Sequence, residues 1–282
     1  MSDKISDRLR YMSRLAKERA EKFSELSLED AYIRIGGNGF RAVSVAETSP
    51  LASYGKMVEK NDKKVWMSTA TVKNWSTVCK HLDYNEPAGI NGTKEERRLQ
   101  AYMIRRAIQT KENSLRELIG NMIGGVEFDD ILFAFDEISL GDQYQKVPFR
   151  NPINGEADGI IRCDLLCVGR RGDEGWPILV ELKYDRQLGR LFEQLDEFSL
   201  FVTKHYKNEF SELLMAATDV QVNCDKCYKV LVWPGNENET DSTKKRLKES
   251  DVQVIEYTVT ETIPDADGDV LKSASFAVKT YE

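Results

Sequence analysis

Three ionisable residues near the middle of the chain, Asp164, Glu181 and Lys183, have the types and spacing needed to bind a metal ion and to act on a phosphate group. They lie in two segments rich in branched aliphatic residues, 160–168 and 176–184, which are separated by the polar sequence GRRGDEG. This pattern predicts a β-hairpin. Charged side chains are seldom buried without a partner, so their presence inside two apolar strands indicates a site.

Strand geometry is expected to bring these side chains together. Side chains two apart on a strand lie on one face, so Glu181 and Lys183 share a face. A hairpin symmetric about Gly172 and Asp173 places Asp164 opposite Glu181, with their Cβ atoms about 5 Å apart. Two carboxylates at that separation repel, and the pKa of one rises unless a cation lies between them. Mg²⁺, which prefers oxygen ligands, is the simplest such cation.

The same residues resemble the Asp…(Asp/Glu)-X-Lys signature of the PD-(D/E)XK nuclease superfamily. Asp164 supplies the first part and Glu181-Leu182-Lys183 the second, while Cys163 stands where the full signature has proline. A Glu-X-Lys triplet alone is common, so the resemblance depends on its surroundings, and it extends over residues 93–259.

A helix is expected after the hairpin, because apolar residues recur there at helical spacing. They are Leu188, Leu191, Leu195 and Val202. Gln194 lies off this stripe and resembles the glutamine of the Gln-X-X-X-Tyr motif of the RecB-type branch. Phe198 replaces the tyrosine of that motif and lacks its hydroxyl, so only Gln194 is carried over to the site.

Glu96 has two interpretations. With Thr93 it has the spacing of a capping box at the start of a helix. It also begins the sequence EERRLQ, which resembles the first core helix of several branches of the superfamily, where a glutamate points toward the metal site. Gln100 lies one turn further along the same side of this helix. The sequence leaves both interpretations open.

The resemblance implies a fold of the broad α/β class, more narrowly α+β with a mixed sheet. Residues 93–282 are expected to form its restriction-endonuclease-like core. Besides the hairpin, we expect core strands at 131–136, 228–233 and 252–259, a helical piece at 114–122 and an irregular strand at 144–149.

Residues 1–85 are expected to form a separate, small α+β region, bounded by the turn-rich stretch 83–92. Its predicted elements are an amphipathic helix at 6–23, a hairpin turned at 36–39 and a strand at 63–72. By position alone, its role would be to recognise a protein partner or to orient the core.

The activity that the resemblance implies is Mg²⁺-dependent hydrolysis of phosphodiester bonds, with Mn²⁺ as a substitute and DNA as the expected substrate. Asp164, Glu181 and the backbone carbonyl of Leu182 would bind the metal, and a protonated Lys183 would stabilise charge on the phosphate. Gln194 would hydrogen-bond the attacking water or a phosphate oxygen, and Glu96 would complete a second metal position. By analogy, the setting would be restriction, recombination or defence against phage.

Other interpretations stay open. The fold could serve scaffolding or nucleic-acid binding without catalysis, since a fold alone does not establish chemistry. Glu181 and Lys183 could also form an ion pair on a solvated sheet face. A third alternative is a zinc site built from Cys163, Cys167, Cys224 and Cys227, although small core residues explain the first two more simply.

The net charge of −7 means that contact with nucleic acid must come from local basic regions. Five arginines around the hairpin are predicted to contact backbone phosphates: Arg162, Arg170, Arg171, Arg186 and Arg190. Two further basic runs, each with the alternative of a plain solvated face, are Lys94, Arg97, Arg98, Arg105 and Arg106, and Lys244, Lys245, Arg246 and Lys248.

We expect a cytoplasmic protein. The charged N-terminal stretch has no apolar core of a secretory signal, no segment approaches transmembrane length, and five cysteines form no disulfide framework. Cleavage of both strands of a duplex would need two active sites, which favours a homodimer.

Two substitutions separate the predicted roles of lysine and aspartate. Lys183→Ala should retain Mg²⁺ binding and lose cleavage, because the lysine acts on the phosphate. Asp164→Asn should lose both, because a metal ligand is removed. Calorimetric titration with Mg²⁺ and a cleavage assay would measure the two effects, and normal cleavage by Lys183→Ala would contradict the assignment.

Overall fold

The structure is a computed structural model of the whole chain. It describes residues 6, 9, 10, 13, 55–60, 63–68, 94–108, 110, 114–139, 162–184, 186, 191–235, 239–263 and 270–281.

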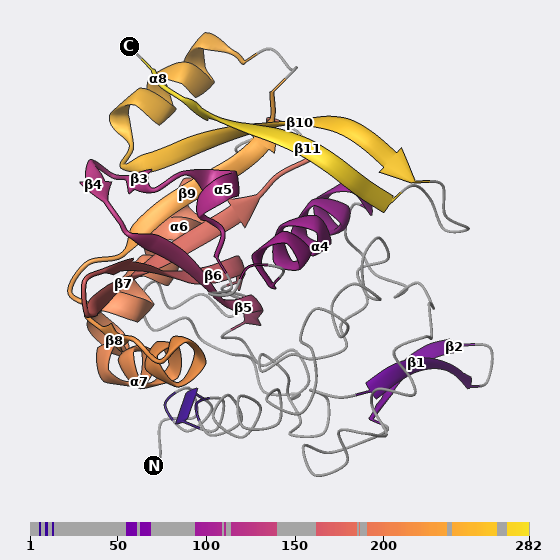
Figure 1. Cartoon of the computed structure of the whole chain (residues 1–282), viewed down its shortest axis with the longest axis horizontal. Helices are drawn as coiled ribbons and strands as arrows, with labels where there is room; N and C mark the ends of the chain where they lie inside the picture. Colours follow the sequence, from indigo (N-terminus) through magenta and orange to yellow (C-terminus); the bar gives the residue numbers. More distant parts are fainter. Residues whose placement is uncertain are drawn as a thin grey trace.

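The described part of the chain contains both strands and helices, which follow one another in mixed order (Figure 1). The strands are β1 (Gly55–Lys60), β2 (Lys63–Ser68), β3 (Met122–Ile123), β4 (Val126–Glu127), β5 (Asp130–Ser139), β6 (Arg162–Arg171), β7 (Glu174–Leu182), β8 (Gln221–Val222), β9 (Tyr228–Pro234), β10 (Val252–Ile263) and β11 (Val270–Lys279). The helices are α4 (Lys94–Ile108), α5 (Arg116–Ile119), α6 (Leu191–Leu200), the π-helical turn η2 (Phe201–His205), α7 (Lys207–Thr218) and α8 (Asp241–Glu249).

A seven-stranded mixed sheet is the centre of the fold. Its order is β11-β10-β9-β7-β6-β5, and β8 pairs with β7 off this path. The pairs β5/β6, β6/β7 and β10/β11 are antiparallel, whereas β9 runs parallel to both β7 and β10. The chain is therefore a mixed α/β protein, as the sequence predicts.

The predicted hairpin forms with the predicted register. Leu165 pairs with Val180, and the ladder continues without a shift to Arg171 and Glu174. Gly172 begins the two-residue turn with φ +60°, a value that favours glycine and that a type II′ turn requires at this position. The pairing expected one step beyond Leu165 and Val180 places Asp164 beside Glu181.

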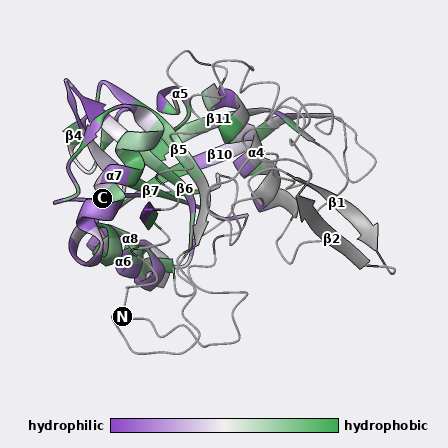
Figure 2. Ribbon diagram, turned by 90° about the horizontal axis from the view of Figure 1, so that it is seen from below, coloured by the Kyte–Doolittle hydropathy of each residue, from purple (hydrophilic) through white to green (hydrophobic). Residues whose placement is uncertain are grey.

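Helices cover both faces of the sheet, because each face is apolar. Leu99, Met103 and Ala107 of α4 recur at helical spacing and are buried on one face, together with α5. On the other face α6, η2, α7 and α8 bury a second cluster that includes Leu195 and Leu247. Figure 2 shows the strands between α5 on one side and α6 and α8 on the other.

Several predicted elements are confirmed. The strands expected at 131–136, 228–233 and 252–259 lie within β5, β9 and β10, and the strand expected at 63–72 contains β2. The helical piece expected at 114–122 is only the short α5. Among the elements that were not predicted are β1, α7, α8 and β11. The predictions for 36–39, 83–92 and 144–149 lie outside the described residues. Within the described part of the chain, every helix is too short or too polar to cross a membrane.

The first predicted helix packs on the sheet domain. Its described residues Ser6, Leu9, Arg10 and Ser13 are helical, and Leu9 is fully buried in the core cluster of α6 and α7. The Ser6 hydroxyl donates a hydrogen bond to Glu209 Oε1 of α7 at 2.6 Å, and Arg10 pairs with the same oxygen at 3.4 Å. At this point the expected separate N-terminal region contributes to the main core.

This packing predicts a large stability cost for Leu9→Ala. Removing a fully buried leucine should lower the free energy of unfolding by about 2–5 kcal/mol. Met122→Ala is a matched control, because Met122 is 49% exposed, and its cost should stay within about 0.5 kcal/mol. Urea unfolding measures both. Equal, small effects would show that the first helix does not belong to the core.

Candidate active site at the ends of strands β6 and β7

Three elements bring four charged residues together at one edge of the sheet. Lys183 directly follows β7, Glu181 lies near the end of that strand, Asp164 lies near the start of β6, and Glu96 lies in the first turn of α4. Lys183 Nζ is 2.7 Å from Glu181 Oε1 and 3.3 Å from Glu96 Oε1. Glu96, one of whose two interpretations was a helix cap, thus lies against the predicted site.

Asp164 is held by hydrogen bonds from two sides. The backbone N–H of Leu182 donates to Asp164 Oδ2 at 2.8 Å, so the side chain connects the two strands beyond the last ladder pair. Gln100 of α4, which is buried, donates from Nε2 to the Asp164 carbonyl at 3.0 Å. Because Glu96 and Gln100 are four residues apart on one helix face, α4 contacts the site at two points.

The site carries more negative than positive charge. The pKa of Glu181 is raised to about 8, mainly by burial and also by the charges of Asp164 and Glu96, and Lys183 offsets only part of the effect. Three carboxylates thus share one ammonium among the described residues. Carboxylates that are close together have raised pKa values when no bound cation neutralises their charge. The raised pKa of Glu181 agrees with this situation.

Lys183 stays protonated in this setting. Burial alone would lower its pKa, but the charges of Glu181 and Asp164, the hydrogen bond to Glu181 and the charge of Glu96 raise it above the ordinary lysine value. A lysine in this state is an electrostatic partner rather than a general base.

The donor set fits a hard cation in kind and in charge. The carboxylates of Asp164 and Glu181 and the carbonyl of Leu182 are oxygen ligands of the type that Mg²⁺ binds. In the structure, however, Lys183 Nζ donates to the Leu182 carbonyl at 3.0 Å as well as to Glu181. Across the described ranges, no three His, Cys, Asp or Glu side chains are arranged to hold a metal ion. Metal binding would therefore require the ammonium to leave these oxygens.

The alternative zinc site gains no support. Cys163, Cys167, Cys224 and Cys227 are free and buried, and none belongs to a metal-ready group among the described residues. Burial raises the pKa of Cys224 to about 12, which disfavours the thiolate that zinc needs.

Gln194 lies on the exposed side of α6, away from the buried stripe of Leu191, Leu195 and Phe198. Among the described side chains, it forms no hydrogen bond with Asp164, Glu181 or Lys183.

Two of the arginines predicted to contact phosphate lie far from the site. Arg170 and Arg171 lie next to the hairpin turn, and Arg171 is seven residues along β6 from Asp164, or about 23 Å at strand spacing. Arg170 also pairs with Asp130 at 3.8 Å. The side chain of Arg162 and all of Arg190 lie outside the described part of the chain.

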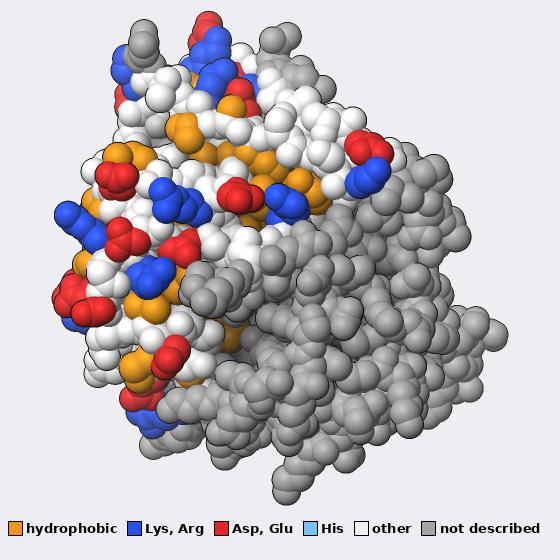
Figure 3. All heavy atoms as spheres, in the orientation of Figure 1, with side chains coloured by type: hydrophobic (Ala, Val, Ile, Leu, Met, Phe, Trp, Pro, Cys, Tyr) orange, Lys and Arg blue, Asp and Glu red, His pale blue; other side chains and the backbone are white. Residues whose placement is uncertain are grey.

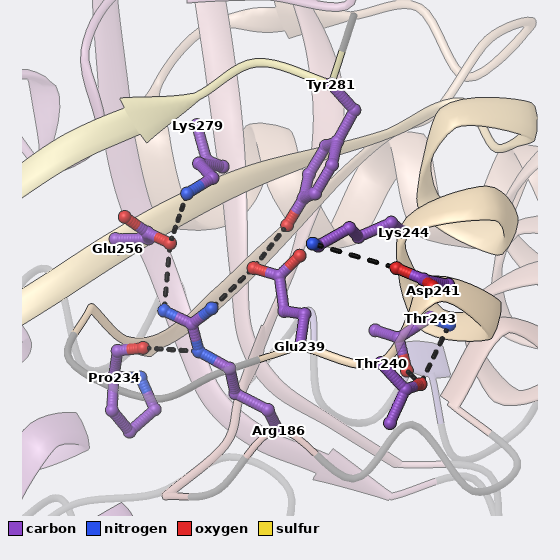
Figure 4. Close-up of polar contacts among 10 residues, drawn as sticks. All are labelled: Arg186, Pro234, Glu239, Thr240, Asp241, Thr243, Lys244, Glu256, Lys279 and Tyr281. Atoms are coloured by element: carbon purple, nitrogen blue, oxygen red, sulfur yellow. Dashed lines mark hydrogen bonds and ion pairs between the residues drawn. The ribbon is translucent and has the colours of Figure 1, made fainter.

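Arg186 has a role different from the one predicted. Its side chain is only 6% exposed. Its guanidinium donates to the carbonyl of Pro234 at 2.8 Å, to Glu239 and to Glu256 Oε1 at 2.8 Å (Figure 4). It also lies over the Trp233 ring, 4.9 Å from its centroid. Because these partners use its donors, we leave Arg186 out of any phosphate-binding surface.

Sequence reasoning missed the structural roles of Gln100 and Arg186. For Gln100 a signal existed, since it lies one turn from Glu96 on the same helix face. For Arg186 there was none, because its partners come from three segments that are distant in the sequence.

The chain was compared with models of protein families, with curated proteins and with solved structures, and no match was found in any of the three comparisons.

The raised pKa of Glu181 predicts a pH-dependent stability. Between its ordinary value and about 8, the folded state retains a proton that the unfolded state has lost, so stability falls as the pH rises through this range. Glu181→Gln removes this loss. The stability of the variant relative to wild type should therefore rise by at least about 1 kcal/mol between about pH 5 and 9.

Urea unfolding in EDTA at several pH values would measure this difference. Glu174→Gln, an exposed position on the same strand, is the control and should show a flat profile. If the stability of Glu181→Gln relative to wild type is also independent of pH, the pKa of Glu181 is not raised in the folded protein.

Proposed function

We propose that this protein is a metal-dependent nuclease with a restriction-endonuclease-like core. The observation that carries the proposal is the meeting of Glu96, Asp164, Glu181 and Lys183 at one sheet edge, where three carboxylates share one ammonium. The order α4, β5, β6, β7, α6, β9 agrees with the order of core elements that the resemblance implies. The first observation concerns side-chain chemistry and the second concerns topology, and both support the proposal.

The residues divide the proposed work among themselves. Asp164, Glu181 and the Leu182 carbonyl would hold Mg²⁺, or Mn²⁺ in its place. A bound ion of this kind polarises a phosphoryl oxygen and lowers the pKa of a coordinated water. Lys183, once released from Glu181, lies where its charge stabilises a phosphate that gains negative charge. Glu96, at 3.3 Å from Lys183 Nζ, orients the ammonium.

The substrate in this proposal is DNA, and the setting, by analogy with the superfamily, is restriction, recombination or defence against phage. Gln194, exposed on α6, stays the predicted hydrogen-bond partner of the attacking water or of a phosphate oxygen.

A second candidate is a non-catalytic module that binds or scaffolds nucleic acid. One observation favours it: the ammonium of Lys183 already contacts Glu181 and the Leu182 carbonyl, which the proposed metal would need. In that case the lysine is a permanent counter-ion, and the site is a structural ion cluster.

A cleavage experiment separates the two candidates. Supercoiled plasmid, linear duplex, single-stranded DNA and RNA are incubated with wild type in Mg²⁺, Mn²⁺ or EDTA. The nuclease predicts cleavage that requires a metal and that is lost in Lys183→Ala. Lys226→Ala, an exposed lysine beside the far ends of the strands, is the matched control and should cleave normally.

Absence of cleavage with either metal on all four substrates would overturn the nuclease proposal and favour the module. Cleavage that persists in EDTA, or that is unaffected by Lys183→Ala, would assign the activity to other residues.

A further inference from the structure

Helix α8 begins at the same edge of the sheet as the candidate site. Strands β7 and β9 are parallel neighbours, and the Lys183 N–H donates to the carbonyl of Val232 near the end of β9 at 2.9 Å. The chain leaves β9 after Pro234 and enters α8 at Asp241. The first turn of α8 therefore lies next to the ends of the strands that carry Glu181 and Lys183.

Arg186 fixes this first turn to the segment that follows Lys183. It contacts Pro234 at the end of β9 and Glu239 just before α8 (Figure 4). Thr240 caps the helix by accepting a hydrogen bond from the Thr243 N–H at 3.1 Å. The oxygen of Glu239 that binds Arg186 also accepts from the Tyr281 hydroxyl at 3.0 Å. Three segments thus set the position of α8 relative to the site.

The outer side of α8 is rich in lysine. Leu247 is buried against the sheet, while Lys244, Lys245 and Lys248 are exposed. Helical spacing of three and four residues places these lysines on one stripe, which we call the lysine stripe. Lys244 has only a weak pair with Asp241 at 3.9 Å. Within the described residues, Lys245 and Lys248 form no ion pair. Figure 3 shows Lys and Arg side chains, with Asp and Glu side chains among them, at the top of the molecule, over α8.

Arg246 differs from these lysines because it is used within the fold. It pairs with Glu193 of α6 at 3.5 Å and lies over the Phe192 ring at 4.9 Å. The positive charge of α8 that is not used within the fold therefore comes from the three lysines. The exposed Asp241 and Glu249 lie beside them at helical spacing and offset part of it.

The sheet register gives the distance from Lys279 of β11 to the site. Helix α8 itself begins at the site end of the strands and runs toward the start of β10, so Lys244 and Lys245 lie nearer the site end than Lys248. Glu181 pairs with Leu231, Leu231 with Val254, and Val254 with Lys279. Lys279 is thus level with Glu181 on the same face, three strand spacings or about 14 Å away. A nucleic-acid strand covers this distance in about four nucleotides at ~3.4 Å each. Lys279 also pairs with Glu256 at 3.2 Å, so the free charge comes from the lysine stripe.

We propose that the lysine stripe binds the phosphate backbone of the DNA that reaches the candidate site. This inference rests on the proposed function, and it moves the contact surface from the predicted hairpin arginines to α8. Arg170 and Arg171 lie at the opposite end of the hairpin from Asp164, and Arg186 is buried. A chain with net charge −7 repels DNA at long range, so a local basic surface near the site is what association requires.

Binding measurements with charge-reversal variants test the proposal. Fluorescence anisotropy with a labelled random-sequence duplex and its single strand would be recorded in EDTA over a series of salt concentrations. Lys245→Glu/Lys248→Glu should weaken binding by about tenfold or more at low salt. The slope of the logarithm of the binding constant against the logarithm of the salt concentration should fall by the amount expected for the loss of about two phosphate contacts. The matched control is Lys204→Glu/Lys226→Glu, which changes two exposed lysines outside α8 by the same charge. It should bind nearly as wild type does.

The outcomes for the two proposals are distinct. If wild type cleaves DNA but both double variants lose affinity equally, or neither does, the lysine stripe is overturned while the nuclease stands. If the stripe variant alone loses affinity but wild type never cleaves, the nuclease is overturned and the stripe stands. Absence of DNA binding by wild type would overturn the stripe as well. Thermal unfolding of each variant confirms that the fold is retained.

Discussion

The register of the hairpin β6/β7 is the constraint on which the rest of the site depends. The ladder fixes Leu165 opposite Val180, and the Leu182 N–H continues it by donating to the carboxylate of Asp164. A slip of one residue would turn Asp164 and Glu181 to opposite faces. The tight turn at Gly172 and the buried aliphatic side chains on both faces oppose such a slip.

This register brings like charges together, and residues outside the two strands contribute to the charge balance. It places two carboxylates together, α4 adds Glu96, and Lys183 is the ammonium that contacts two of the three. The pKa of Glu181 stays raised to about 8, so the compensation is incomplete. A group of side chains in this state is costly for stability and receptive to a cation, and such conflicts between stability and charge are typical of functional sites.

The residues around the four charged side chains of the site are held where β7 and β9 end. Arg186, three residues beyond Lys183, joins the end of β9, the start of α8 and β10 in one buried network. Buried ion pairs with several partners constrain geometry more than they add stability. The network therefore couples the position of the lysine to that of α8, and on the other face α4 contributes the equivalent contact through Gln100.

The sequence by itself determined the local features: the two hairpin strands and their register, the strands within β5, β9 and β10, and the apolar stripe of α6. Each follows from periodicity or turn chemistry over a few neighbouring residues. Only the tertiary structure decided which charged residues meet. It brought Glu96 to Lys183, left Gln194 exposed, buried Arg186 among partners from distant segments, and packed Leu9 into the main core. Such meetings depend on contacts between residues far apart in the chain, which local patterns do not specify, because helix and strand periods fix only which face is apolar.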